Sequence, residues 1–148
     1  RPSVLIDVEM EDLLRQLTEA AGASEDIIFH LETETQGDLP PDVQITIYRI
    51  AQETLNNIIK HAQCENVTIT YKDKLDSKGH LSKAELTIKD DGVGFDLNLV
   101  SPDRMGLGIM AERAESIGAA LNISSQKGQG TSVQLIWLGS SKEGNQDG

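Results

Sequence analysis

The chain has 148 residues, of which 38% are hydrophobic, and its formal net charge is −11. This length suits one domain with one buried core, and we expect no second domain. The charge excludes general nucleic-acid binding, because affinity for a phosphate backbone needs clustered Lys and Arg. We expect no membrane span, since the sequence has no apolar run of about 20 residues. We also expect no signal peptide, since the first residues do not follow the order of charged, apolar and small residues that a signal peptide has.

Cys64 is the only cysteine. One cysteine can form neither an intrachain disulfide nor a cysteine cluster for a metal, which is consistent with a reducing cytoplasm. We expect Cys64 to fill a small space after a helix.

The first half of the chain predicts two helices and one strand. Residues 9–22 have helical periodicity and end at a glycine, and Ile27–Glu34 has the composition of a strand. Pro41 suits the first turn of a second helix, which we expect to run to about His61.

This second helix carries two different faces. An apolar stripe at helical spacing predicts that one face packs into the core; its members are Ile45, Tyr48, Ala51, Leu55, Ile58 and Ala62. Polar residues gather elsewhere on the helix, namely Arg49, Glu53, Asn57, Lys60 and His61. They fit either a solvated surface or the wall of a polar site.

The second half predicts two hairpins around a helix. Asn66–Lys72 and Ser82–Asp90 alternate as strands, and we expect Asp73–Leu81 to be an exposed loop of no consequence. Residues 91–105 suit a mobile segment over a ligand. A helix from Gly106 to Ile117 and strands Ala120–Gln126 and Thr131–Leu138 follow.

These elements predict an α/β fold of the α+β kind. The expected architecture is a two-layer sandwich, in which a mixed sheet is covered on one face by helices. We expect the domain to occupy residues 1–138. The tail, residues 139–148, lacks apolar residues and should be disordered.

Three glycine-bearing segments follow the second helix in a fixed order. They are Asp90–Asp91–Gly92–Val93–Gly94, Met105–Gly106–Leu107–Gly108 and Gly128–Gln129–Gly130–Thr131. Each alone is weak evidence, because glycines more often serve turns and helix ends. A Rossmann interpretation of the second segment is disfavoured, since a loop and not a strand precedes it. The order of the three segments after the Glu/Asn helix is more specific.

These motifs resemble the ATP-binding catalytic domain of bacterial two-component sensor histidine kinases. The family belongs to the superfamily of gyrase, the Hsp90 chaperones and MutL, and its ATP-binding domain has a Bergerat-type fold. The segment 48–62 looks like the N box of the nitrate-sensor and degradative-sensor subfamily, and the three glycine segments look like its glycine boxes. The resemblance covers roughly residues 1–138. The second box has fewer glycines than in many members.

The resemblance implies roles for residues of the N box. Asn57 would bind the Mg²⁺ that bridges the ATP phosphates, as a neutral oxygen ligand. Glu53 would orient Mg²⁺-bound water or assist proton removal, although a structural salt bridge to Arg49 is an open alternative. Lys60 and His61 would touch phosphate oxygens. Because the chain is strongly acidic, free ATP would be repelled without a divalent cation.

The glycine boxes would complete the nucleotide site. Asp90 would accept the adenine amine, since a carboxylate only accepts hydrogen bonds, and Thr131 would support it through a shared water. Gly92 and Gly94 belong to the same box, with Gly94 letting the backbone approach the base. In the second box, Gly106, Leu107 and Gly108 would let a lid approach the phosphates. We expect Met105, Met110 and Trp137 to be packing residues.

The implied reaction transfers the γ-phosphoryl group of ATP to a histidine on a separate dimerisation domain, for relay to a response regulator. None of His30, His61 and His80 lies on an acceptor helix, so we expect an excised catalytic domain that is monomeric. It should be cytoplasmic, in a parent protein that can be membrane-anchored. An anti-sigma-type serine kinase, a gyrase- or chaperone-like ATPase and a non-catalytic regulator-binding module are the alternatives.

Overall fold

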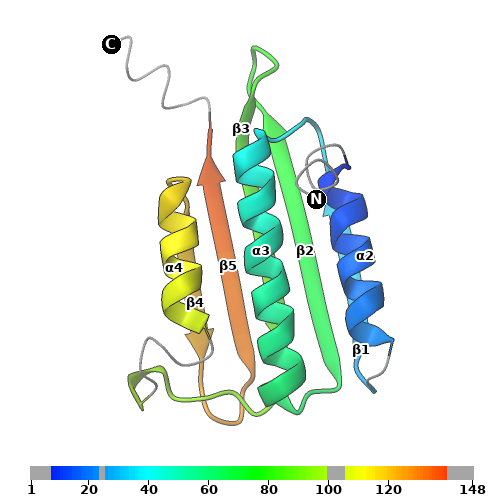
Figure 1. Ribbon diagram of the computed structural model, residues 1–148, viewed down its shortest axis with the longest axis vertical. Helices are drawn as coiled ribbons and strands as arrows, with labels where there is room; N and C mark the ends of the chain where they lie inside the picture. Colours follow the sequence, from blue (N-terminus) through cyan, green and yellow to red (C-terminus); the bar gives the residue numbers. More distant parts are fainter. Residues whose placement is uncertain (1–7, 24–25, 100–105, 140–148) are drawn as a thin grey trace.

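The computed structural model describes residues 8–23, 26–99 and 106–139. Within these residues, three helices cover one face of a five-stranded sheet (Figure 1). The helices are α2 (Met10–Gly22), α3 (Pro41–Asn57) and α4 (Leu107–Ser116), and the strands are β1 (Ile28–Glu34), β2 (Asn66–Leu75), β3 (Leu81–Asp90), β4 (Ala120–Ser125) and β5 (Thr131–Leu138). The predicted two-layer α/β sandwich is confirmed.

The sheet is mixed, with strand order β1-β2-β3-β5-β4. β1 and β2 are parallel and connected through α3, while the other neighbouring strands are antiparallel. In the β3–β5 ladder, Asp90 lies opposite Thr131. Two residues 41 positions apart in the sequence are therefore neighbours at one end of these two inner strands.

Helix α3 lies over the middle of the sheet, and its inward side forms much of the core (Figure 1). The most buried positions of this helix follow a 3–4 spacing through Val43, Ile47, Ile50, Ala51 and Leu55. The predicted stripe is therefore right at Ala51 and Leu55 but wrong at Ile45 and Tyr48, which are only partly buried.

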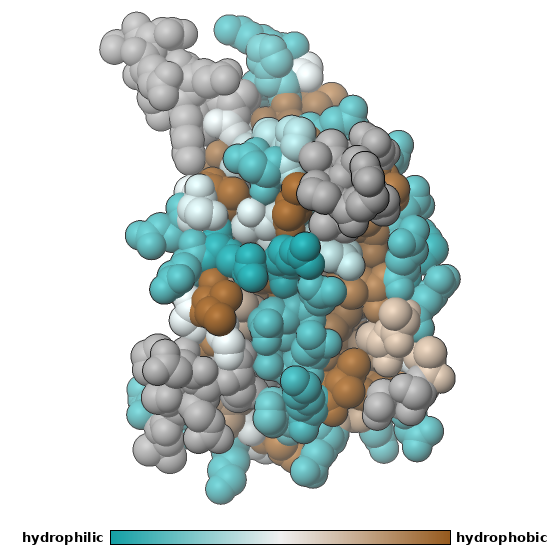
Figure 2. Space-filling model, viewed as in Figure 1, coloured by the Kyte–Doolittle hydropathy of each residue, from teal (hydrophilic) through white to brown (hydrophobic). Residues whose placement is uncertain are grey.

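The outward side of α3 is hydrophilic, and Figure 2 shows this face as a teal column in the middle of the molecule. Asp42, Arg49 and Asn56 are exposed there. The Arg49 guanidinium lies 5.9 Å from the centre of the ring of Tyr48, a cation–π contact with this partly buried aromatic residue.

The α-helix ends earlier than predicted. Regular α-helical geometry stops at Asn57, and Ile58–Ala62 continue as a π-helical turn that ends at Gln63 in the left-handed conformation, with φ 51°. The carbonyl of Ala62 accepts a hydrogen bond from the Val93 amide at 2.8 Å. A tertiary partner therefore fixes the last turn, and periodicity in the sequence cannot show such a partner.

The connection between β2 and β3 is shorter than predicted, because both strands extend into Asp73–Leu81. Asp73 is only 2% exposed, and its Oδ1 accepts the backbone N–H groups of Gln36 at 2.5 Å and Gly37 at 3.2 Å. The Tyr71 hydroxyl donates to Asp73 Oδ2 at 2.9 Å. The prediction of an exposed loop of no consequence is therefore wrong at Asp73, which ties β2 to the segment before α3.

Several predictions lie partly or wholly outside the described residues. They concern the tail beyond Gly139, the second part of the segment 91–105, Met105 and the first seven residues. Among the helices that the structure describes, none has the length and apolar character needed to cross a bilayer.

Candidate functional site

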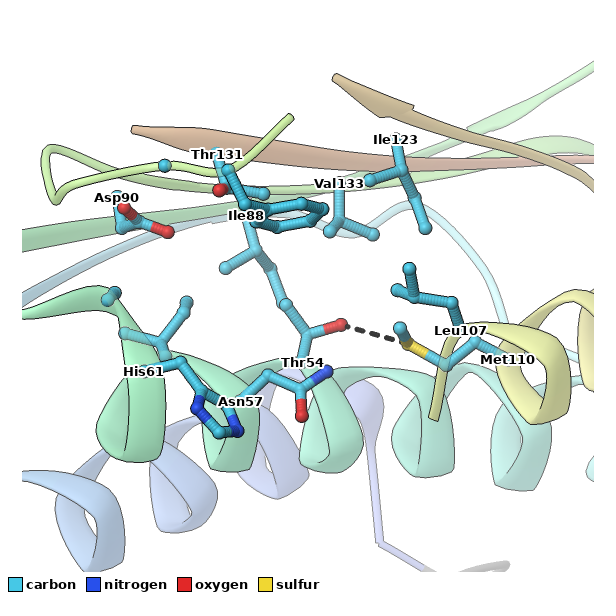
Figure 3. Close-up of a pocket in the computed structure, with 14 residues that line it drawn as sticks. Thr54, Asn57, His61, Ile88, Asp90, Leu107, Met110, Ile123, Thr131 and Val133 are labelled. Carbon is cyan, nitrogen blue, oxygen red and sulfur yellow. Dashed lines mark hydrogen bonds between the residues drawn. The ribbon is translucent and has the colours of Figure 1, made fainter. Parts of the chain in front are cut away.

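A cavity of about 860 Å³, including its open mouth, lies between α3, α4 and the sheet (Figure 3). Its polar residues gather on the side of Asp90 and His61, and its apolar residues gather toward α4. The lining residues are Thr54, Asn57, Ile58, His61, Ala62, Ile88, Asp90, Gly94, Phe95, Leu107, Met110, Ile123, Thr131 and Val133.

Asp90 ends strand β3 and lies in the wall of this cavity. Its side chain is largely shielded, since the residue is 9% exposed, and Oδ1 accepts the Gly92 amide at 2.8 Å. Burial raises the pKa of this carboxyl, against the opposing effect of the backbone N–H groups of Gly92 and Thr131. Asp90 is thus a hydrogen-bond acceptor aimed into a mostly apolar space.

Thr131 completes the polar side of the cavity. Its hydroxyl lies 2.8 Å from Ser125 Oγ, which also accepts the Phe95 amide at 2.8 Å. The β4–β5 hairpin therefore fixes the loop that follows Asp90. Sequence reasoning missed Ser125, because a serine at a strand end carries no distinguishing signal.

Gly94 is required where this loop passes the hairpin. Its φ is +65°, and a Cβ at this position would lie 2.1 Å from the carbonyl oxygen of Gln126. The close approach that was predicted for Gly94 is thus made to the protein backbone, and the residue also lines the cavity.

The helix side of the cavity contains Asn57 and His61 but not all the predicted N-box residues. Lys60 is exposed and lies outside the lining. Glu53 lies against Gly106, where an added Cβ would be 2.9 Å from Glu53 Oε2. Among the ion pairs of the described residues none joins Arg49 to Glu53, and Arg49 instead donates to Gln52 Oε1 at 3.3 Å.

The remaining predicted residues of the glycine segments lie in or next to the cavity wall. Gly92 packs on the end of the π-helical turn, since a Cβ there would lie 2.1 Å from the Ala62 carbonyl oxygen. Gly106 precedes α4 with a φ of +67°, Leu107 lines the cavity, and Gly108 lies outside the lining.

The apolar side of the cavity was missed apart from Leu107. Thr54 donates to the Ile50 carbonyl at 2.8 Å and to the Met110 sulfur at 3.5 Å, which joins α3 to α4 (Figure 3). Met110 is 1% exposed, so it packs as predicted and lines the cavity as well. Strand alternation contains a usable signal for Ile88 and Val133, because each lies two positions from a predicted polar residue on the same face.

The cavity offers few protein side chains that could bind a metal ion. Within the described ranges, no group of three or more His, Cys, Asp or Glu side chains could hold a metal ion. Burial, followed by the Asp90 and Asp91 carboxylates, raises the pKa of Cys64 to about 11, so its thiol stays protonated at neutral pH. A metal at this site would need oxygens of a bound ligand together with a neutral donor such as Asn57.

Comparison with protein-family models shows the family of the chain. Residues 42–141 match the model described as histidine kinase-, DNA gyrase B-, and HSP90-like ATPase. The chain belongs to this ATPase family. The match covers α3, the cavity and the last strand.

The chain is also similar in sequence to several curated proteins, most of them named as histidine kinases. The chain is 32% identical over 140 residues to the sensor histidine kinase ComP of Bacillus subtilis, and 30% identical over 142 residues to the histidine-protein kinase/phosphatase DegS of the same organism. Each alignment covers 91% of this chain, but only 17% of ComP and 35% of DegS. The nitrate/nitrite sensor NarX of Escherichia coli is 26% identical, with 84% of this chain and 21% of NarX covered.

Solved structures show the same fold. The blue-light activated histidine kinase of Erythrobacter litoralis matches with a TM-score of 0.72 and 20% identity, over 93% of this chain and 44% of that one. The mycobacterial sensor histidine kinase MprB matches with a TM-score of 0.61 and 18% identity, over 88% and 95% of the two chains. The chain is thus an ATPase domain of this family, similar in sequence to the ATPase domains of sensor histidine kinases, and it spans about a third or less of the curated relatives it matches.

Proposed function

We propose that this chain binds Mg-ATP and, within its parent protein, transfers the γ-phosphoryl group to a histidine of a separate dimerisation domain. A response regulator would then take the phosphoryl group from that histidine. The observation that carries the proposal is the Asp90 carboxylate, which is nearly buried in the wall of a cavity that is otherwise mostly apolar.

Recognition of adenine follows from the chemistry of Asp90. An ionised carboxylate accepts hydrogen bonds and donates none, so it pairs with the exocyclic amine of adenine. Guanine presents a carbonyl oxygen at that position and would be repelled. Thr131, which neighbours Asp90 across the ladder, supports the same edge of the base through a shared water. Ile88 and Val133 offer apolar contact to the ring.

The fit to Mg²⁺ rests on the donor set. Mg²⁺ prefers oxygen ligands, keeps several waters and is commonly held by one or two protein oxygens together with substrate phosphates. Asn57 lines the cavity and offers a neutral oxygen of this kind. When bound, Mg²⁺ would neutralise phosphate charge, which matters on a chain with a net charge of −11.

The phosphates are assigned to the N-box end of α3. His61, in the cavity wall, and Lys60, on the exposed side of the π-helical turn, can donate to phosphate oxygens. Gly106, Leu107 and Gly108 begin α4 nearby and keep that approach open. Glu53 is one turn before Asn57, where it can orient metal-bound water or assist the acceptor histidine.

The parent protein supplies what this chain lacks. His30 lies in β1, His61 in the cavity wall and His80 in the β2–β3 connection, so none is placed on a dimerisation helix. We infer that phosphotransfer occurs to another domain, in the cytoplasm, and that the isolated chain is a monomer that binds ATP and transfers little phosphate.

The test adds the histidine-bearing dimerisation domain of the parent protein to this chain, with ATP radiolabelled at the γ-phosphate. We expect an acid-labile, base-stable phosphohistidine on the added domain, and we expect Asn57→Ala and Glu53→Gln to abolish or slow its formation. An acid-stable phosphoserine on a partner would indicate a serine kinase instead. A chain that binds no adenine nucleotide would be a regulator-binding module.

A further inference from the structure

We propose that Asp91 is a positioning residue of the nucleotide pocket, because its carboxylate fastens the segment after the N-box helix to the loop that follows Asp90. This inference rests on the proposed function, since the pocket is assigned to Mg-ATP. Asp91 itself is exposed and does not line the cavity, so any effect on nucleotide binding passes through other residues.

Four hydrogen bonds join Asp91 to the segment that follows the π-helical turn. Its Oδ1 accepts the backbone N–H groups of Glu65 and Asn66, each at 2.9 Å. Its Oδ2 accepts the Asn66 side-chain amide at 3.1 Å, and its own backbone amide donates to the Asn66 carbonyl at 3.2 Å. Both oxygens of the Asp91 carboxylate therefore bond the same short segment, Glu65–Asn66.

The next residues continue the junction into the pocket wall. The Val93 amide donates to the Ala62 carbonyl at 2.8 Å, and Gly92 packs so closely on that carbonyl that no Cβ fits between them. Ala62 and Asp90 both line the cavity, and His61 precedes Ala62 directly. The helix wall and the adenine-reading loop are therefore bound to each other over residues 62–66 and 90–93.

The negative charge of Asp91 suits it to accept these hydrogen bonds from Glu65 and Asn66. Hydrogen bonds from the Asn66 backbone and side chain, and then from Glu65, lower the pKa of Asp91 below its usual 3.8, so it is a carboxylate at neutral pH. Asparagine at position 91 would keep one oxygen for the two backbone donors. Its amide nitrogen would then face the Asn66 amide nitrogen, so either two donors oppose each other or Asn66 turns its amide over and changes its 3.2 Å contact from Oδ1 to His30 Nε2.

Asp76 provides a matched control. Its Oδ1 also accepts two backbone N–H groups at 2.9 Å, from Lys78 and His80, in the connection between β2 and β3. Asp76 does not line the cavity, and the hairpin lies at the opposite end of the sheet from the loop after Asp90 (Figure 1). Asp76→Asn thus perturbs a half-buried carboxylate with the same pair of backbone donors, outside the cavity lining.

The experiment measures the Kd for Mg-ATP by calorimetry on the wild-type chain, Asp91→Asn and Asp76→Asn, at a temperature where thermal unfolding shows all three folded. We expect Asp91→Asn to weaken binding about tenfold, which corresponds to about 1.4 kcal/mol, and Asp76→Asn to leave the Kd within twofold. In the double variant Asp91→Asn/Asn66→Asp, donor and acceptor are exchanged across the same pair, and binding should return to within threefold of wild type.

A second readout separates this inference from the proposed function. Without nucleotide, amide hydrogen exchange of Val93 should accelerate in Asp91→Asn and not in Asp76→Asn, because that amide bonds the Ala62 carbonyl. Unchanged Kd and unchanged Val93 exchange in Asp91→Asn would overturn the positioning role. Equal loss of affinity in the two single variants would overturn it as well. A wild-type chain that binds no Mg-ATP would overturn the proposed function, and accelerated Val93 exchange would still show the junction.

Discussion

Asp90 is subject to two opposing requirements. The proposed role in base recognition needs a carboxylate, yet burial disfavours the charged form and raises the pKa of Asp90. The Gly92 amide, 2.8 Å from Oδ1, offsets part of that cost. A residue that is unfavourable for folding and favourable for recognition is typical of a binding site.

The raised pKa predicts the pH dependence of nucleotide binding. The folded chain holds the Asp90 proton more tightly than the unfolded chain, so the stability associated with protonated Asp90 is lost as pH rises through its folded-state pKa. Binding of adenine runs the other way, because the ionised carboxylate accepts a hydrogen bond from the amine more strongly than the protonated carboxyl does. We expect the affinity for Mg-ATP, measured by calorimetry across pH, to fall in acid with a midpoint above 3.8. An affinity of the wild-type chain that stays constant through this range would contradict the role of Asp90.

Gly94 predicts a steric effect that a distant glycine does not share. Gly94 and Gly79 both have positive φ, +65° and +85°, so alanine at either position costs about 1 kcal/mol of backbone strain. Only at Gly94 would the new Cβ meet a backbone oxygen, at 2.1 Å, whereas nothing lies within 4 Å at Gly79.

We therefore expect Gly94→Ala to lower the free energy of unfolding by about 2 kcal/mol more than Gly79→Ala, and to weaken Mg-ATP binding at least tenfold. Denaturant unfolding and calorimetry measure the two effects. Equal stability losses in the two variants would show that the loop moves aside.

Among the elements, α3 illustrates how far the sequence alone reaches. Pro41 and the alternation of apolar and polar residues predict a helix with one core face, and the structure has it. The π-helical turn at Ile58–Ala62 was not predictable, because it depends on the Ala62–Val93 hydrogen bond across 31 positions. Ile45 and Tyr48 are less buried than their spacing suggests, since hydrophobic periodicity does not show where neighbouring helices leave a gap.

Strand β2 contains a polar residue whose burial the sequence alone did not predict. Asp73 looks like the start of a hydrophilic loop in the sequence, yet it lies in the strand and accepts Gln36, Gly37 and Tyr71 donors. Gln36 and Gly37 lie 37 and 36 positions earlier, and no local pattern indicates these two partners. Burial, and then the charge of Asp73, raise the pKa of Tyr71, so the tyrosine stays a donor.

Asp73→Asn should therefore destabilise the fold without touching the nucleotide site. An amide in place of this 2%-exposed carboxylate removes one acceptor and introduces a donor, and we expect a loss of about 2 kcal/mol in the free energy of unfolding. The Kd for Mg-ATP should stay within twofold, because Asp73 is not among the cavity residues. Chemical denaturation and calorimetry on the same samples test this separation; weakened binding would mean that the two ends of the sheet are coupled.

At the scale of the whole molecule, the predicted fold is confirmed, but the assembly of the cavity needed the structure. Strand register places Asp90 beside Thr131 and brings Val133 and Ile123 onto one wall. Sequence order alone could not place Glu53 against Gly106 or leave Lys60 outside the lining. These positions depend on how α3 and α4 approach each other.

The net charge of −11 predicts a metal requirement. Free ATP is a polyanion approaching an acidic chain, and a divalent cation reduces this repulsion as well as using the Asn57 oxygen. Removal of Mg²⁺ with a chelator should weaken ATP binding at least tenfold, and added salt should recover part of that loss by screening. Equilibrium titration with and without Mg²⁺ measures this effect. In Asn57→Ala the difference between the two titrations should shrink; an unchanged difference would remove Asn57 from the metal site.

The central claim is that Asp90 reads adenine in this cavity. Its most direct test is calorimetric titration of the wild-type chain and Asp90→Asn with Mg-ATP and Mg-GTP at neutral pH, with thermal unfolding to show that both chains are folded. The account predicts that the wild-type chain binds Mg-ATP, that Mg-GTP binds at least about tenfold more weakly, and that Asp90→Asn loses the affinity for Mg-ATP while staying folded. A wild-type chain that binds neither nucleotide, or binds both equally, would contradict it.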